Sequence, residues 1–194
     1  MAPLFIADDV IERAQRGDAA AFAAIVAEFE RPVFNYILRS VGDRGLAEDL
    51  SQEVFLRVYQ SLPRFSFRSK FTTWLFQIAK NRVVDEFRSR ERRPPPDELD
   101  HDVLRMADAP VERAATIDAI CRAVAELPLD LRTALLLRDI SGFSYDEIAD
   151  VEGVTLAAVK WRIYRARELV VESVAAEGLI EAHEAPSGPL AQTG

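Results

Sequence analysis

The sequence predicts an all-α protein built from two small helical domains joined by a flexible linker. Apolar residues recur along most of the 194 residues at the i, i+3, i+4, i+7 spacing that is typical of amphipathic helices. No stretch alternates between apolar and polar residues for long enough to indicate a β-sheet. Three consecutive prolines, at 94–96, cannot continue a helix and favour extended backbone, so they mark a boundary between the domains.

Helices are expected on both sides of the prolines, with a tail after the second domain. The first helical pattern, around 22–41, contains Pro32, which we expect to kink or divide it. Two further helices are expected over 46–62 and 72–92. Periodicity is lost after Ala176, which predicts a disordered tail. The predicted organisation is a first domain at 1–93, an acidic, proline-rich linker at 94–116, a second domain at 117–175 and a tail at 176–194.

Composition restricts both the location and the chemistry of the chain. The sequence has no run of about 18 or more apolar residues, the length that spans a bilayer. Its start, MAPLFIADDV, lacks the basic residues and long apolar stretch of a signal peptide, so we expect the protein to act in the cytoplasm. The single cysteine, Cys121, follows Ile117 and Ile120 in an apolar series and is expected to be a buried small hydrophobe rather than a redox switch.

Charge is segregated along the sequence. The net charge of -8 conceals two basic islands: residues 57–93 carry 10 basic and 3 acidic side chains, and residues 155–168 carry 4 and 1. The segments around them are acidic, most strongly 94–154, with 5 basic and 14 acidic side chains. Because acidic segments repel nucleic acid, this pattern predicts DNA contact at the two islands and leaves the other faces for protein partners.

The second basic island follows a helix-turn-helix pattern. Ser144 and Glu147 stand at the N-cap and N3 spacing of a capping box, which predicts the start of a helix. Gly153 can adopt the positive φ of a tight turn, and a longer helix is expected to begin near Thr155. A short helix, a glycine turn and a longer helix form the motif whose second helix enters the major groove of DNA.

Helical projection gives this second helix a buried side and a nucleic-acid side. The buried side comprises Leu156, Val159, Ile163, Ala166 and Val170. The opposite side mixes small, cationic and aromatic groups, and a merely solvated charged face explains its two aromatic rings poorly. The residues expected to contact DNA are Ala157, Lys160, Trp161, Tyr164 and Arg165, flanked by Arg162 and Arg167 for phosphates.

The helix expected at 46–62 has a polar face opposite its core. This face contains Asp49, Gln52, Glu53, Leu56 and Gln60. Carboxylates at i and i+4 suit a catalytic or metal-binding pair, but no histidine and no glycine-rich phosphate loop lies near them in sequence. Three interpretations stay open: a small helical enzyme, a solvated face, or a docking surface for a basic helix. No cofactor and no metal is expected.

The helix expected at 72–92 and the loop before it combine aromatic and basic side chains. Aromatic rings stack on unpaired bases, and Asn or Gln side chains read base edges, so this combination suits melted DNA. Trp74 by itself is also typical of a partly buried core residue. The helix contributes Trp74, Gln77, Asn81, Arg88 and Arg92 on one face, and the loop contributes Phe65, Phe67, Arg68 and Lys70.

The order of these parts resembles one protein family. The segments DLSQEVF, FTTWLFQIAKNRVVDEFRSRERR and LPLDLRTALLLRDISGFSYDEIADVEGVTLAAVKWRIYRARELV, within residues 17–172, closely resemble the two conserved domains of bacterial RNA polymerase sigma factors. The chain looks like the small extracytoplasmic-function class, group IV of the sigma-seventy superfamily. The resemblance implies a subunit that is not an enzyme, binds core RNA polymerase, recognises the -10 and -35 promoter elements, promotes melting and is controlled by an anti-sigma factor.

The resemblance also assigns roles to individual residues. Asp49, Gln52, Glu53 and Leu56 match the surface for the clamp of the largest polymerase subunit, and contact with the flap of the second-largest subunit is also implied. The residues that match the -10 recognition and melting part are Phe67, Arg68, Lys70, Trp74, Gln77, Asn81, Arg82 and Arg88. The -35 contacts match the predicted DNA side of the last helix, where Trp161 replaces the small Ser or the Arg of many relatives.

The main alternative is a stand-alone helix-turn-helix regulator that binds duplex DNA without polymerase.

Overall fold

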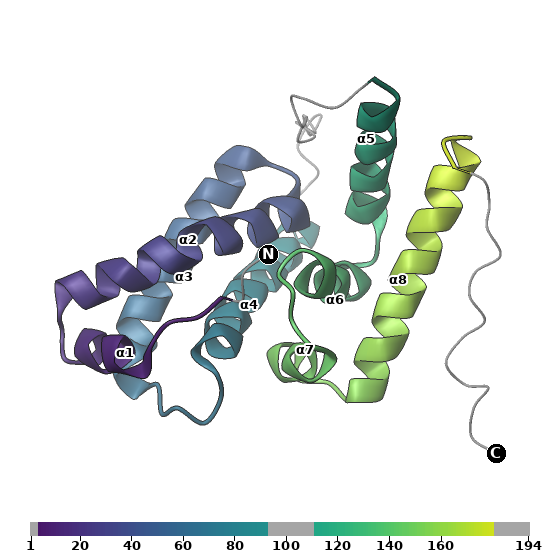
Figure 1. Ribbon diagram of the computed structural model, residues 1–194. Helices are drawn as coiled ribbons and strands as arrows, with labels where there is room; N and C mark the ends of the chain where they lie inside the picture. Colours follow the sequence, from purple (N-terminus) through teal and green to yellow (C-terminus); the bar gives the residue numbers. More distant parts are fainter. Residues whose placement is uncertain (1–3, 93–110, 181–194) are drawn as a thin grey trace, which may run out of the picture.

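A computed structural model describes residues 4–92 and 111–180, and this part of the chain is helical without a β-strand (Figure 1). The all-α prediction is confirmed, and no helix within these residues has the length and hydropathy of a membrane span. The first domain contains α1 (Asp8–Gln15), α2 (Ala19–Val41), α3 (Arg44–Ser61), the 3-10 turn η1 (Leu62–Arg64) and α4 (Phe71–Glu91). The second contains α5 (Val111–Glu126), α6 (Leu129–Asp139), α7 (Tyr145–Glu152) and α8 (Leu156–Ala176).

Helix α2 is the centre of the first domain, where it packs against α1, α3 and α4. Pro32 lies inside α2 but does not divide it, contrary to one of the two outcomes expected from the sequence. A proline in a helix removes one backbone hydrogen bond. The fully buried side chains of Phe29, Val33 and Tyr36 on either side of it hold the helix against the core, so tertiary packing offsets that loss.

The helix-turn-helix prediction for the second domain is confirmed. The Glu147 amide donates to the Ser144 hydroxyl at 3.3 Å, and the Ser144 amide donates to the Glu147 carboxylate at 2.8 Å, which completes the capping box of α7. Gly153 ends α7 with a left-handed φ of 68°. The Thr155 hydroxyl accepts from the Ala158 amide at 3.2 Å and starts α8. The turn chemistry in the sequence therefore determines this motif locally.

Helical structure after the prolines begins earlier than the sequence analysis predicted. Helix α5 begins at Val111, so residues 111–116, which we assigned to the linker, are helical. This segment, VERAAT, contains no proline or glycine and includes four good helix formers, so it extends the periodic pattern that follows it. Residues 94–110 of the predicted linker and 181–194 of the predicted tail lie outside the described residues, as does residue 93 at the end of the predicted first domain.

Cys121 is half-buried, not buried as expected. It lies with Ile120, which is 41% exposed, beside an apolar groove of about 630 Å³ between α2, α5, α6 and α8. The prediction was wrong because one side of α5 is left uncovered by the helices around it.

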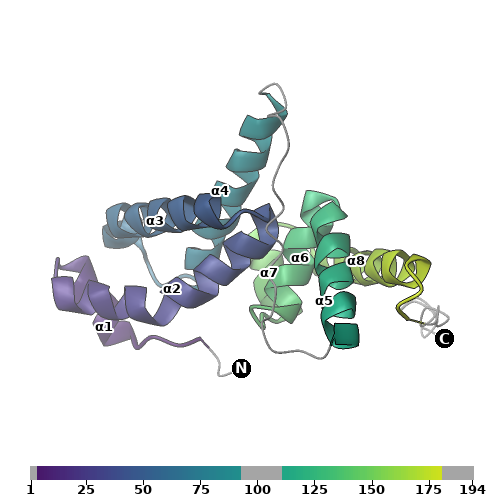
Figure 2. The same cartoon turned by 90° about the horizontal axis from the view of Figure 1, so that it is seen from above.

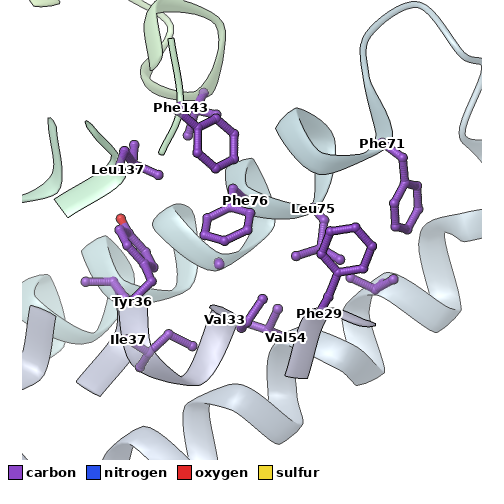
Figure 3. Packing of buried hydrophobic residues seen from close by; sticks show 14 of the residues in the cluster. Phe29, Val33, Tyr36, Ile37, Val54, Phe71, Leu75, Phe76, Leu137 and Phe143 are labelled. Carbon is purple, nitrogen blue, oxygen red and sulfur yellow. The ribbon is translucent and has the colours of Figure 1, made fainter. Parts of the chain in front are cut away.

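The two domains pack against each other, which the sequence did not predict. Helix α4 contacts α7, α2 contacts α5 and α6, and one cluster of buried apolar side chains runs through both domains. Figure 3 shows Leu137 and Phe143 of the second domain pointing toward Tyr36 and Phe76 of the first. The rings of Phe76 and Phe143 meet edge to face at a centroid distance of 4.8 Å. Figure 2 shows the domains side by side, with α6 and α7 next to the first domain.

The capping box gives a direct test of what starts α7. Ser144→Ala removes the hydroxyl acceptor and should lower the free energy of unfolding of the protein by about 1 kcal/mol. Urea denaturation followed by circular dichroism measures this change. Ser66→Ala, at an exposed position before α4, is the matched control and should stay within about 0.5 kcal/mol of wild type. Equal losses in the two variants would contradict the capping role.

Candidate nucleic-acid interface

Helix α8 presents a mixed aromatic and basic surface on its N-terminal half. Val159, Ile163 and Ala166 pack into the domain and are at most 1% exposed, as the helical projection predicts. Leu156 and Val170, predicted on the same buried side, are only half-buried. Lys160 is exposed, and Trp161 is 59% exposed. The other predicted contacts on this side are Ala157, which is exposed, and Tyr164 and Arg165, which are half-buried. The geometry therefore offers an indole ring and an ammonium group on the side of α8 that faces away from its own domain.

Arg162 holds the helix-turn-helix together. Its Nη1 lies 2.5 Å from Oε2 of Glu152, and its Nε lies 3.5 Å from Asp130. The Glu152 side chain is only 2% exposed and also accepts a hydrogen bond from Thr133 Oγ1 at 2.7 Å. A buried carboxylate needs a cation and donors around it. Arg162 thus joins α6, α7 and α8, a structural role that the sequence did not reveal beside the predicted phosphate contact.

The other arginines of the second basic island pair with acids of their own domain. Arg165 donates to Glu168 and lies 3.8 Å from Glu172, and Arg167 lies 2.6 Å from Asp139. The hydrogen bond to Glu168 raises the pKa of Arg165. Both arginines keep more than a third of their side-chain surface exposed. Exposed pairs of this kind contribute little to stability, so a DNA phosphate can displace these carboxylates.

The loop between η1 and α4 forms an aromatic platform. Trp74 is half-buried and packs against Phe65 and Phe71 at centroid distances of 5.0 and 5.5 Å. Phe67 stands 4.9 Å from Phe65 and is 41% exposed, and Arg68 beside it is exposed. Among the described residues, Phe67 is the one non-glycine with a positive φ, at 55°. Such a backbone conformation is costly for a bulky residue and is often found at functional sites.

Two side chains of the predicted -10 set contact α7. The Nε2 of Gln77 donates to the backbone carbonyl of Asp150 at 2.7 Å. The Nζ of Lys70 donates to Oε1 of Glu147 at 2.8 Å, and this hydrogen bond raises the pKa of Lys70. The structure therefore places part of the predicted nucleic-acid surface against the second domain.

Arg82 links α4 to α3. Its Nε lies 2.5 Å from Oε2 of Glu53, and its Nη2 lies 3.3 Å from Oε2 of Glu86. The hydrogen bond from Arg82 lowers the pKa of Glu53. A residue predicted for DNA and a residue predicted for a protein partner are thus the two halves of one ion pair.

The structure adds Arg57 and Arg64, which the sequence analysis missed, beside Asn81. Asn81 and Arg88 are both exposed, and Asn81 lies at the edge of a hollow of about 380 Å³ between the end of α3 and α4. Its lining combines Arg57, Gln60, Ser61, Arg64, Ile78 and Asn81. Arg57, Gln60 and Arg64 recur at i, i+3 and i+7, a spacing that could have identified them as one helix face.

The exposed face of α3 lies on the opposite side of that helix from its core. Asp49, Gln52 and Glu53 are exposed, and Leu56 and Tyr59 are 56% and 54% exposed. Exposed apolar side chains with polar residues around them are typical of a protein-binding surface. The described part of the chain contains no cluster of three or more His, Cys, Asp or Glu that could hold a metal ion.

Family models match both helical domains. Residues 25–93 match Sigma-70 region 2, and residues 117–170 match Sigma-70 region 4. The chain belongs to the sigma-70 family of RNA polymerase sigma factors. This sigma factor binds core RNA polymerase and directs promoter-specific transcription initiation. The members of this family are transcription initiation factors.

Curated relatives place this sigma factor in the extracytoplasmic-function class. The RNA polymerase sigma-H factor of Pseudomonas aeruginosa is 38% identical over 175 residues, which cover 83% of this chain and 90% of that protein. The ECF RNA polymerase sigma-E factors of Haemophilus influenzae and Escherichia coli K12 are both 32% identical over 177 residues, covering 85% of this chain and 93% and 92% of theirs. The family resemblance inferred from the sequence motifs is confirmed.

Solved structures show the same fold. CnrH, in complex with the cytosolic domain of CnrY, aligns with a TM-score of 0.67 at 24% identity over 87% of this chain and 96% of that one. The sigma factor RpoE, in complex with the anti-sigma factor NepR from Bartonella quintana, aligns with a TM-score of 0.67 at 22% identity over 80% and 98%.

The pair of Arg162 and Glu152 predicts that neighbouring residues of α8 differ in their roles. Arg162→Ala leaves a buried carboxylate without its cation and should lower the free energy of unfolding by about 3 kcal/mol. Trp161→Ala, at the adjacent exposed position, should change it by less than about 0.5 kcal/mol. Thermal and urea denaturation of both variants check this. A neutral Arg162→Ala would show that the ion pair is dispensable.

Proposed function

We propose that this sigma factor initiates transcription through three separate surfaces. The exposed face of α3 binds the polymerase clamp, the aromatic loop with α4 binds the -10 element, and the N-terminal half of α8 binds the -35 element. The observation that most supports this division is that net positive charge is concentrated in two islands, 57–93 and 155–168, of a chain whose net charge is -8. The protein itself catalyses no reaction, needs no cofactor and works in the cytoplasm.

The -35 element is read by Lys160 and Trp161. Both are exposed on the half of α8 that enters the major groove in this motif. The bulky indole favours van der Waals contact, such as with a thymine methyl group, over a hydrogen bond to a base edge. Arg165 and Arg167 exchange their carboxylate partners for DNA phosphates, and Arg162 contributes mainly through its pair with Glu152.

The -10 element is melted and captured where the middle of α4 lies beside the end of α3. Asn81, at the edge of the hollow, has both a donor and an acceptor for the edge of an unpaired base. The exposed ring of Phe67 provides a stacking surface. Arg64 and Arg57 line the hollow, and Arg88 is exposed further along α4. In this proposal these cations contact the phosphates of the strand.

Protein partners bind the remaining faces. Asp49 and Glu53 attract a basic helix of the clamp, and Leu56 supplies apolar contact area. The second domain contacts the flap of the second-largest polymerase subunit. Of the aligned proteins, CnrH forms a complex with the cytosolic domain of CnrY, and the sigma factor RpoE forms one with the anti-sigma factor NepR. We propose that an anti-sigma factor controls this chain as well.

Reconstitution with core RNA polymerase tests the proposed function. Transcripts that start at defined sites on genomic fragments and require both components are the expected result. Tight binding to duplex DNA by the chain alone, without any such transcript, would instead identify a stand-alone regulator.

Charge reversal on α3 tests the docking surface. Asp49→Lys should weaken polymerase binding at least about tenfold, because it places a cation where a basic partner helix docks. Glu28→Lys, at an exposed position of α2, makes the same change of charge outside this surface and should bind as wild type does. Fluorescence anisotropy of the labelled protein titrated with core polymerase measures both affinities. Equal affinities would reject the docking assignment.

Asn81→Ala tests base capture. The variant should bind polymerase normally but form open complexes less well by about 1–3 kcal/mol, or roughly 5- to 150-fold. Permanganate reactivity of unpaired thymines, on a promoter selected by the reconstituted enzyme, measures opening. Ser89→Ala, further along the same helix, is the control. If Asn81→Ala opens the promoter as wild type does, its proposed role is wrong.

A further inference from the structure

Arg82, which the family resemblance assigns to the -10 element, is the least exposed arginine of that set. Its side chain is 14% exposed, whereas Arg68 and Arg88 are exposed. The Nε of Arg82 lies 2.5 Å from Oε2 of Glu53, and its Nη2 lies 3.3 Å from Oε2 of Glu86. The guanidinium group therefore faces α3 and the next turn of α4, and it presents little surface to a DNA strand.

Glu86 makes this position costly for Arg82 to leave. The Glu86 side chain is as little exposed as that of Arg82, and its Oε1 accepts a further hydrogen bond from Nε of Arg90 at 3.3 Å. Moving Arg82 to a DNA phosphate would take a cation away from a largely buried carboxylate, which needs cations and donors around it. The more exposed pairs of Arg165 and Arg167 lack this constraint.

The ion pair of Arg82 and Glu53 lies next to the hollow in which the proposed function places base capture. Asn81 directly precedes Arg82 on α4, and Glu53 lies one turn before Arg57 on α3. Asn81 and Arg57 both line the hollow. Arg57 also lies 3.7 Å from Asp85 of α4, in an exposed pair that contributes little. The pair of Arg82 and Glu53 thus joins the two helices that form the walls of the hollow, at the turn immediately beyond it.

The direction of the Asn81 amide depends on how α4 sits on α3. Among the described residues, the Asn81 side chain makes one hydrogen bond, which Nζ of Lys80 on the same helix donates at 3.2 Å. Apolar packing holds α3 and α4 together deeper in the domain. At the surface beside Asn81, the bridge from Arg82 to Glu53 fixes the spacing of the two helices.

We propose that Arg82 is a positioning residue for base capture and not a phosphate contact. Its planar, fork-shaped guanidinium group bridges Glu53 and Glu86, holds α4 in place on α3, and so aims the Asn81 amide at the unpaired base. The inference rests on the proposed function for the role of Asn81. A carboxylate has several acceptor sites, so Glu53 can hold Arg82 and still offer negative charge to the docking face.

The salt dependence of promoter binding separates a positioning residue from a phosphate contact. Loss of one phosphate contact lowers the slope of log affinity against log salt concentration by about 0.7–0.9. Arg88→Gln, at an exposed position, should show this loss. Arg82→Gln combined with Glu86→Gln keeps the local net charge and should leave the slope unchanged. Fluorescence anisotropy of a labelled promoter fragment titrated with holoenzyme, at several concentrations of potassium chloride, measures the slopes. Equal losses in the two variants would overturn the proposal.

Promoter opening tests whether Arg82 acts through Asn81. At saturating core polymerase, Arg82→Gln should reduce the permanganate reactivity of unpaired thymines by up to the roughly 5- to 150-fold expected for Asn81→Ala. Adding Arg82→Gln to Asn81→Ala should cause no further loss, because residues that act as a unit are not additive. Arg16→Gln, at an exposed position of α1, removes the same charge as a control and should open the promoter as wild type does. Losses that multiply in the double variant would contradict the positioning role.

Arg82→Lys provides a second variant that keeps the positive charge beside the two acids. A lysine ammonium suffices for a phosphate, but it is a point charge and does not reproduce the planar bridge between two carboxylates. Opening should therefore fall in Arg82→Lys as well, while urea denaturation confirms that the protein is folded at the temperature of the assay. Opening equal to that of wild type would show that only the charge of Arg82 matters, and the proposal would be wrong.

The wild-type holoenzyme separates this inference from the proposed function. If wild type opens promoters and the Arg82 variants behave as phosphate contacts do, the positioning role fails and the proposed function stands. A wild-type holoenzyme that opens no promoter would instead refute the proposed function, and this inference with it.

Discussion

The packing of Leu137 and Phe143 against Tyr36 and Phe76 is the interaction on which the rest of this structure depends. It turns two helical units into one continuous apolar cluster and sets α7 directly against α4. That placement decides which side of α4 is covered, because Gln77 of α4 and Lys70 before it donate hydrogen bonds to α7. The exposed face of α3 lies outside this contact. The distribution of exposed chemistry is therefore a property of the domain contact as well as of each domain.

Many of the arginines predicted to contact DNA form ion pairs with acidic side chains of the protein itself. Three arginines of the second basic island pair with acids of their own domain, and only Arg162 does so with a buried carboxylate. Arg82 is likewise held between Glu53 and Glu86. Exposed pairs exchange readily with phosphates, whereas a buried pair is costly to break. An arginine paired with an exposed carboxylate thus remains available to DNA, whereas one paired with a buried carboxylate, such as Arg162, stabilises the fold.

The sequence predicted the features that depend on residue type and on spacing along the chain. The capping box of Ser144 and Glu147, the glycine turn at Gly153 and the buried side of α8 all follow from residue type and spacing. The predicted exposure of Lys160 and Trp161 has the same origin. The half-buried Cys121 and the structural pair of Arg162 with Glu152 were missed, because each depends on which helices cover a side chain and not on its neighbours in sequence. The helical start at Val111 was also missed, although the composition of 111–116 favours a helix.

By itself, the sequence determined the helical class, the order of the two domains, the family and the position of the two basic islands. Helix periodicity, caps and charge runs are local and additive, and so they can be read from a single chain. Only the tertiary structure decided that Lys70 and Gln77 contact α7, that Asn81 borders a hollow with Arg57 and Arg64, and that the domains share a core. These features arise from contacts between residues more than 15 positions apart, where the packing of whole helices determines which side chains meet.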